Sequence, residues 1–324
     1  MSSKNTLLEV RNLKTYFYTY RGVVKALEGV NLKLGYNEIM GLVGETGSGK
    51  SVTALSIMRL INPPGKILSG EIIFDGRDLL KLSKEEMREI RGKEISMIFQ
   101  EPRAALNPVM RVGDQIAEAI ETHEKLKKEE LKNAVIDLLK KVGLPDPDRL
   151  INQYPHELSG GMAQRVVIAM AIAFKPKLLI ADEPTSSLDV TIQAQILDLL
   201  EDLVSEMGSS VLFITHNLGV AAELCNKISV MYAGTVVESC DTYTIFDDPL
   251  HPYTVGLIKA VPKMGQRGEL YVIEGELPDL VNPPPGCRFH PRCPKAMEIC
   301  KRTPPKTIEI KPGHVVACHL YNEG

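Results

Sequence analysis

Short apolar segments alternate with helical patterns along most of the chain, and this alternation predicts the fold class. Strand-like segments after residue 34 lie at 70–76, 95–100, 177–183, 210–216 and 228–234. Helical patterns separate many of them, which favours a largely parallel sheet covered by helices. Residues 7–34 are strand-like, with alternating and β-branched side chains, and we expect an antiparallel flap there. The hydrophobic pattern therefore predicts an α/β fold.

Two regions depart from this alternation. Residues from about 104 to 160 carry helical patterns and no convincing strand, so we expect a helical insert in the α/β domain. Residues 265–324 are rich in proline and hold four of the six cysteines. We therefore expect a larger domain at 1–264, which includes the insert, and a small cysteine-containing module at 265–324.

Composition and charge narrow the class of protein. The chain has 324 residues, which is room for about two domains. Its formal net charge of −3 gives no basic field that would favour nucleic acid, so we expect no nucleic-acid partner. The longest fully apolar run, residues 166–174, is far shorter than the about 20 residues of a membrane span. The first ten residues lack a long apolar core, so we expect a reducing, cytosolic compartment and no disulfide scaffold.

The segment "GETGSGKS" (44–51) follows the apolar stretch "EIMGLV" and precedes a helical pattern. This is the spacing of the P-loop, in which glycines let successive backbone N–H groups wrap a phosphate. The helix after the loop adds unpaired N–H groups and a positive dipole end. A plain glycine-rich turn is the alternative interpretation. The expected nucleotide contacts are Gly44, Glu45, Thr46, Gly47, Ser48, Gly49, Lys50 and Ser51.

Charged and hydroxyl side chains at two places predict ATP hydrolysis. Lys50 would neutralise the β- and γ-phosphates, and the Ser51 hydroxyl would ligate Mg²⁺. The strand-like "LLIADE" (178–183) ends in two carboxylates. Asp182 would hold Mg²⁺, and Glu183 would accept a proton from the attacking water. A strand that ends in solvated acids is the alternative.

The segment "ELSGGMAQR" (157–165) predicts a second anion site. Ser159 is a good helix N-cap, and Gly160 and Gly161 would expose backbone N–H groups before a helical pattern. A simple capped helix start is the alternative. One chain rarely needs two phosphate cradles for one nucleotide, whereas two facing chains could each close the site of the other.

Taken together, these motifs resemble those of the nucleotide-binding subunit of ATP-binding cassette (ABC) transporters. The P-loop, "LSGGM" and "LLIADE" occur in the order of that family across residues 7–240, with "SSLD" (186–189), "MIFQ" and "FITHN" as further matches. Met162 departs from the pattern, because many members have glutamine there. The resemblance implies a P-loop NTPase core that binds ATP and Mg²⁺.

The resemblance also implies roles for single residues. Gln100 would reach Mg²⁺ with Ser51 and would sense the helical insert. The turn at Ser159, Gly160 and Gly161 would contact the γ-phosphate held by a partner chain.

Three further positions receive roles from the same resemblance. His216 would position the γ-phosphate, and Asp189 would help to link the two sites of a dimer. Phe17 matches the aromatic residue that stacks on adenine, and Tyr16 and Tyr18 are adjacent alternatives.

The segments at 100–108, 251–262 and 284–300 resemble the oligopeptide/dipeptide importer branch of this family. This implies an ATP-hydrolysing subunit on the cytoplasmic face of the cell membrane. Its implied partners are a second ATPase subunit, identical or homologous, two integral-membrane permease subunits and an extracytoplasmic substrate-binding protein. Nickel and oligosaccharide importers share the branch. A soluble cassette ATPase or a metal-sensing protein with a vestigial ATPase is an alternative of another class.

Four cysteines in the C-terminal module, Cys287, Cys293, Cys300 and Cys318, are separated by five, six and seventeen residues. Structural zinc usually shows cysteines two to four residues apart, whereas longer gaps suit an iron–sulfur cluster. The resemblance favours a [4Fe–4S] cluster, and zinc and plain thiols are the alternatives. His290, His314 and His319 are spare ligands. The remaining cysteines, Cys225 and Cys240, are expected to be small core residues.

Overall fold

The computed structural model describes residues 5–261 and 271–321 and divides the chain into two compact units. The first unit combines residues 1–81 with 213–324, and the second holds residues 82–212. The predicted domain boundary between 264 and 265 lies outside the described residues. Among the described residues, no helix is both long and apolar enough to cross a membrane.

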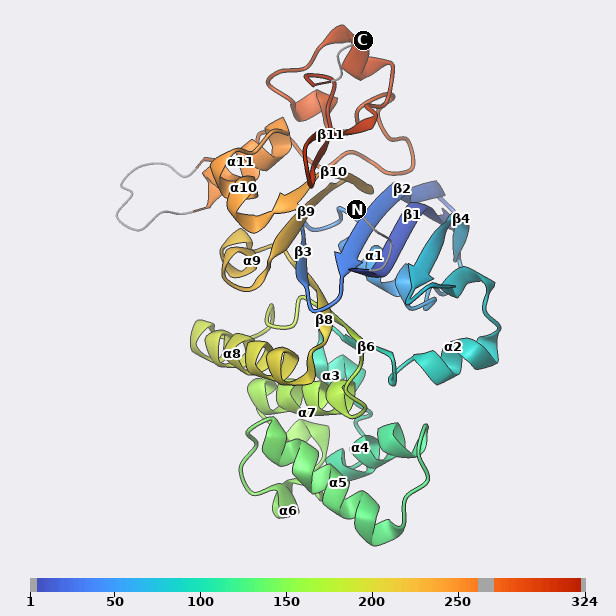
Figure 1. Cartoon of the computed structure of the whole chain (residues 1–324), viewed down its shortest axis with the longest axis vertical. Coiled ribbons are helices and arrows are strands. Elements are labelled where there is room, and N and C mark those ends of the chain that lie inside the picture. The colour runs from blue at the N-terminus through green and yellow to red at the C-terminus, as the bar shows by residue number, and fades with distance from the viewer. Residues whose placement is uncertain (1–4, 262–270, 322–324) are drawn as a thin grey trace. The chain divides into compact units, whose positions relative to one another are not determined.

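An antiparallel flap forms one sheet of the first unit (Figure 1), as the alternating pattern of residues 7–34 predicts. Its strand order is β2-β1-β4-β5, and β1 pairs with both β2 and β4 in the antiparallel sense. Leu13, Leu27 and Val30 from this flap are fully buried. The strands are β1 (Thr6–Thr19), β2 (Gly22–Gly35), β4 (Gly65–Phe74) and β5 (Arg77–Asp78).

The other sheet of the first unit has the order β11-β12-β10-β9-β3-β8. Its strands β3 and β9 pair in parallel, as the alternation of strands and helices predicts, whereas β10 and β12 extend the sheet in the antiparallel sense. The sequence pattern did not predict β10, β11 or β12. The strands are β3 (Ile39–Val43), β8 (Ser210–Thr215), β9 (Lys227–Tyr232), β10 (Thr235–Asp241), β11 (Thr307–Lys311) and β12 (His314–Ala317).

The helices of the first unit are short. The apolar pattern after the phosphate loop continues to Ile61, but the first helix already ends at Ile57. It ends early because Arg59 takes a left-handed φ of 50°, which cannot continue an α-helix. The helices are α1 (Lys50–Ile57), α9 (Leu218–Leu224), α10 (Thr242–Asp247) and α11 (Pro252–Ala260), with 3₁₀ turns η2 (Leu79–Lys81), η4 (His290–Arg292) and η5 (Glu298–Lys301).

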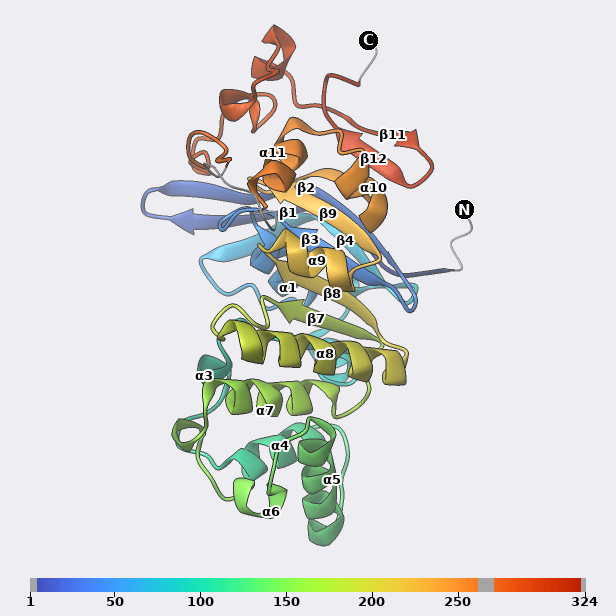
Figure 2. The ribbon, with the colours of Figure 1, turned by 90° about the vertical axis from the view of Figure 1, so that its left-hand side faces the viewer.

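The second unit is mostly helical, and the described residues from 104 to 160 contain no strand, as predicted. Its parallel strands are β6 (Ile95–Ile98) and β7 (Leu178–Asp182). Helix α7 contacts α3, α4 and α5 (Figure 2). The helices are α2 (Lys84–Ile90), α3 (Pro102–Ala105), α4 (Val112–Glu121), α5 (Lys128–Lys141), α6 (Pro147–Leu150), α7 (Gly160–Ile172) and α8 (Val190–Met207), with the 3₁₀ turn η3 (Pro155–Glu157).

Candidate functional site

The predicted phosphate loop connects β3 to α1 in the first unit, between a strand end and a helix N-terminus. Gly44 has a φ of 155°, and a Cβ on it would lie 2.1 Å from the carbonyl oxygen of Met231. Gly49 caps α1 with a φ of 106°, in the left-handed region. Both positions therefore require glycine, and the loop they shape presents backbone N–H groups at a helix N-terminus, where an anion is stabilised.

The side chain of Lys50 folds back over this loop. Its Nζ donates to the carbonyl oxygen of Gly44 at 2.8 Å and to that of Glu45 at 3.1 Å, and the residue is only 4% exposed. These two carbonyl oxygens hold the ammonium group against the loop. A buried cation in this place suits a ligand that brings several negative charges.

The aromatic residues proposed for adenine lie on β1. The ring of Phe17 is half-buried, and its edge lies so close to Gly65 that a Cβ there would be 2.6 Å from Cε1. The hydroxyl of Tyr16 instead donates to the carboxylate of Glu28 at 2.6 Å, and burial together with this hydrogen bond raises the pKa of Tyr16 to about 12. Tyr18 is exposed, with the ammonium of Lys66 5.7 Å from its ring centre.

His216 also belongs to the first unit and follows the last residue of β8. Its side chain is exposed, and the next residue, Asn217, caps α9 by accepting from the backbone N–H groups of Gly219 and Val220. The histidine therefore sits on a turn fixed from both sides, by a strand end and by a helix cap.

In the second unit, β7 ends at two buried carboxylates. Asp182 is 5% exposed and Glu183 is 9% exposed. Glu183 has a φ of 46°, a left-handed conformation that is uncommon outside glycine and is often found at functional sites. The Nε2 of Gln100 donates to the Oε2 of Glu183 at 3.3 Å. The structure therefore brings Gln100 to the predicted base, and carboxylate oxygens of this kind suit Mg²⁺.

Two helix starts of the second unit carry the predicted serine–glycine turn and Asp189. The hydroxyl of Ser159 accepts from the N–H of Met162 at 3.3 Å and caps α7, as predicted. Asp189 caps α8 by accepting from the N–H of Ile192 at 3.1 Å. The turn packs on α8, because a Cβ on Gly161 would lie 2.8 Å from Ile192 Cγ2. Ser159 and Asp189 are both exposed, so this surface is available to another molecule.

The loop between Cys287 and Cys293 contacts the phosphate loop and the flap, which the sequence did not predict. The guanidinium of Arg292 lies 2.9 Å from the carboxylate of Glu45. Arg288 donates to the carbonyl oxygen of Lys25 at 3.1 Å. The sequence shows two arginines between these cysteines, but it does not indicate which residues they contact.

The four tail cysteines lie in the first unit and influence one another electrostatically. Burial, and after it the neighbouring cysteines, raise the pKa of Cys287 to about 11. Four thiolates around one zinc ion lie about 3.8 Å apart, given Zn–S bonds of about 2.3 Å. No three of these sulfurs lie within 4.8 Å of one another in the part of the chain that is described.

The three histidines considered as spare ligands each have a protein partner. The Nδ1 of His290 lies 2.9 Å from the carbonyl oxygen of Cys287, and the Nε2 of His319 lies 2.8 Å from that of Thr303. The Nε2 of His314 lies 2.8 Å from the Oε1 of Glu238. Each histidine thus has one ring nitrogen engaged by a protein group, whereas the Nδ1 of His314 is buried without a hydrogen-bond partner.

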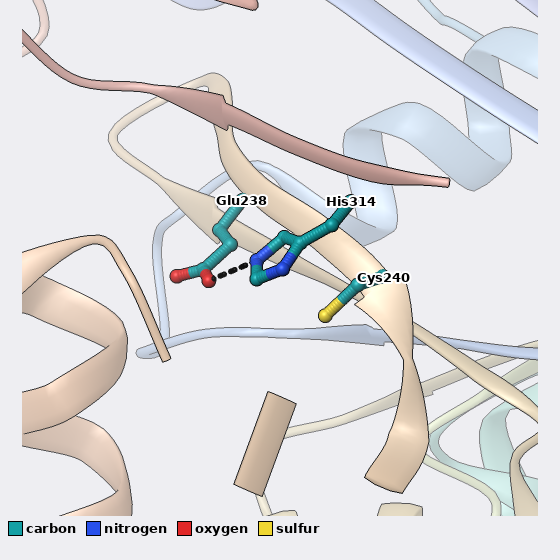
Figure 3. A group of neighbouring side chains, drawn as sticks. All are labelled: Glu238, Cys240 and His314. Atoms are coloured by element: carbon teal, nitrogen blue, oxygen red, sulfur yellow. Dashed lines mark hydrogen bonds and ion pairs between the residues drawn. The ribbon is translucent and has the colours of Figure 1, made fainter. Parts of the chain in front are cut away.

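Glu238, Cys240 and His314 form a buried group whose possible ligand atoms all lie within 4.8 Å (Figure 3). The carboxylate of Glu238 also accepts from the N–H groups of Leu250 and His251 at 2.8 and 2.9 Å. Because these donors already occupy the carboxylate, we interpret the group as a polar link between β10 and β12. Cys240 is fully buried and Cys225 is buried, as predicted.

Comparison with known proteins matches two regions of the chain. Residues 27–186 match the ABC transporter family, and residues 237–300 match the family described as oligopeptide/dipeptide transporter, C-terminal region. The chain is 51% identical over 320 residues to a probable peptide ABC transporter ATP-binding protein, y4tR, of Sinorhizobium fredii; this covers 98% of the chain and 96% of that protein. It is 52% identical over 317 residues to the oligopeptide transport ATP-binding protein OppD of Bacillus subtilis, which covers 97% and 88%.

A solved structure shares the fold. It is the ATP-binding cassette MJ0796, described as a dimer in a post-hydrolysis state bound to ADP and Pi. It is 29% identical in sequence, with a TM-score of 0.65, and the match covers 73% of this chain and 99% of that one. The match leaves about a quarter of this chain outside the shared cassette.

Proposed function

This chain belongs to the ATP-binding subunits of ABC transporters, in the branch that carries an oligopeptide/dipeptide transporter C-terminal region, and we propose that it hydrolyses ATP to drive peptide uptake. The observation that carries the proposal is that one chain holds both the cassette and this C-terminal region. The glycine-dependent phosphate loop and the buried pair Asp182 and Glu183 support it.

In this proposal the first unit binds the nucleotide. The backbone N–H groups of residues 44–51 surround the β- and γ-phosphates, and Lys50 leaves its loop carbonyls to neutralise them. Phe17 stacks on adenine, since the hydroxyl of Tyr16 is already held by Glu28. His216 contacts the γ-phosphate from its fixed turn.

The second unit contributes the groups for hydrolysis. Glu183 accepts a proton from the attacking water, and the hydrogen bond from Gln100 orients its carboxylate. Gln100 and Asp182 offer oxygen atoms that would hold Mg²⁺, which suits a hard cation with oxygen ligands. The resemblance to the family adds the hydroxyl of Ser51, which belongs to the first unit. The ion would neutralise charge that develops on the phosphate oxygens.

We propose that the working enzyme is a head-to-tail dimer. The turn of Ser159, Gly160 and Gly161, in which Ser159 is exposed, would contact the γ-phosphate bound by the facing subunit, and Asp189 would link the two sites. The dimeric state described for MJ0796 supports this arrangement. The facing subunit is either a second copy or a homologous ATPase chain.

The remaining partners follow from the peptide branch. Two integral-membrane permease subunits would receive the movement of the helical insert, and an extracytoplasmic protein would deliver the peptide. The chain would then work at the cytoplasmic face of the cell membrane. Nickel or an oligosaccharide is the alternative cargo. Transport by the reconstituted complex, with a peptide, nickel and an oligosaccharide in competition, separates these cargoes.

We propose that Cys287, Cys293, Cys300 and Cys318 hold a [4Fe–4S] cluster. The support is the long gaps between these cysteines and the match of residues 237–300 to the oligopeptide/dipeptide transporter C-terminal region. Protein purified without oxygen should be brown, with absorbance at about 400 nm, as expected of thiolate-bound iron. A colourless preparation with one zinc ion per chain would show that the proposal is wrong.

The variant Glu183→Gln tests the catalytic proposal. It keeps the shape of the side chain and its contact with Gln100 but removes the base, so hydrolysis should fall by at least about a hundredfold. ATP should still bind, and an ATP-bound dimer should elute early from a sizing column. A variant that hydrolyses ATP at the normal rate would exclude Glu183 as the base.

A further inference from the structure

One residue of the phosphate loop, Glu45, is held by the C-terminal part of the chain. The guanidinium of Arg292 lies 2.9 Å from its carboxylate, and the side chain of Arg292 is only 6% exposed. The backbone N–H of Glu45 donates to the hydroxyl of Tyr253 at 3.0 Å. The carbonyl oxygen of Glu45 in turn accepts from Lys50 at 3.1 Å. Side chain, N–H and carbonyl of one loop residue are therefore all engaged.

Arg292 is itself fixed on every side. Its Nε and Nη2 donate to the carbonyl oxygens of Glu274 and Ile273 at 3.0 and 3.2 Å, and its Nη1 also reaches the hydroxyl of Tyr232 at 3.4 Å. A guanidinium with all its nitrogens engaged has one orientation, so it acts as a rigid support. Its neighbour in the chain is Cys293, so the cysteine loop places this support.

Tyr253 is fixed through the buried link shown in Figure 3. The carboxylate of Glu238 accepts from His314 and from the backbone N–H of His251, two residues before Tyr253. The Nδ1 of His251 then accepts from the N–H of Tyr253 at 3.1 Å. Strand β12 is thus connected, bond by bond, to the tyrosine that holds the phosphate loop.

From these contacts we propose that the part of the chain after β10, called here the C-terminal segment, is a clamp on the phosphate loop. Within it, Arg292 and Tyr253 are positioning residues that set the affinity for ATP. This inference rests on the proposed function, because it concerns the same nucleotide site. The clamp pre-orders Glu45, and with it the backbone of the phosphate loop, so less ordering remains to be done when ATP binds. A change at Cys293 would reach the nucleotide through its neighbour Arg292.

The test is the dissociation constant of a fluorescent ATP analogue with the full chain. The chain has no tryptophan, so the analogue is read against a low background. Arg292→Gln and Glu45→Gln should each weaken binding by about five- to fiftyfold, as expected for a coupled pair. Because both remove the same contact, the double variant should bind about as weakly as either single one. Arg292→Lys, which keeps the charge, should recover part of the affinity.

Lys311→Gln is the matched control. Lys311 lies in the same C-terminal segment and forms an exposed ion pair with Asp248 at 2.8 Å, so its loss should leave ATP affinity unchanged. Wild-type affinity in Arg292→Gln, or fully additive losses in the double variant, would overturn the clamp alone. If Arg292→Gln does not fold, the dissociation constants of Glu45→Gln and Arg292→Lys test the clamp instead, and wild-type affinity in Glu45→Gln would overturn it. Failure of the wild-type chain to bind ATP would instead overturn the proposed function, and the clamp with it.

Discussion

The strongest quantitative prediction concerns His251, which caps α11 from a fully buried position. Burial lowers the pKa of His251 to about 3, from an ordinary value of 6.5. The imidazole is therefore neutral in the folded protein, and its Nδ1 can accept from the N–H of Tyr253. A group that is harder to protonate when folded costs stability whenever the unfolded chain takes up the proton.

The sign and size follow from linkage. Because the folded-state pKa is depressed, the unfolded state binds more protons between pH 6.5 and pH 3, and the free energy of unfolding falls as the pH is lowered through this range. Each pH unit is worth about 1.4 kcal/mol, so lowering the pH from 7 to 5 should cost about 2 kcal/mol through this one histidine. This loss of stability begins as the pH falls below about 6.5 and stops growing below about pH 3.

The assay is urea unfolding followed by circular dichroism at pH 7 and pH 5, for the wild type and for His251→Asn. Asparagine offers an oxygen close to the place of Nδ1 and is a favoured N-cap, so the cap remains while the titrating group is lost. The wild type should lose about 2 kcal/mol more than the variant between the two pH values. Equal losses would show that the buried neutral histidine does not govern stability in this range.

The other predictions concern the loops and the phosphate site. Gly286 has a φ of 72°, and a Cβ on it would lie 2.3 Å from the carbonyl oxygen of Cys300, so Gly286→Ala should destabilise the cysteine module by about 1–3 kcal/mol in thermal unfolding. Gly313→Ala is its control, because Gly313 has a φ of 79° and nothing within 4 Å of a Cβ, so only the smaller backbone cost of about 1 kcal/mol applies. Lys50→Ala should weaken ATP binding by at least about tenfold in calorimetry, since charge-assisted contacts with phosphate are lost; unchanged affinity would contradict the assigned role.

Much of the cassette could be predicted from the sequence because its signals are local. The phosphate loop, the strand ending at Asp182 and the N-cap at Ser159 each depend on residues within a few positions of one another. Glycine conformation, strand periodicity and helix capping act over that distance, so a short stretch of sequence is enough to predict each of these local structures. The flap was predicted only in part. Alternation predicted the strands β1 and β2, whereas the strand-like segment at 70–76, which we expected in the parallel sheet, overlaps β4 of the flap.

Only the tertiary structure decided how the C-terminal segment meets the rest of the first unit. Arg292 and Glu45 are 247 positions apart, and Arg288 and Lys25 are 263 positions apart. No local pattern specifies such a pair, because an arginine has the same secondary-structure propensity whether its side chain faces solvent or a carboxylate. The buried bond between His314 and Glu238 likewise depends on β12 joining β10, two strands that the sequence pattern did not predict. Contacts at this range form only when packing of the intervening chain has brought the two elements together.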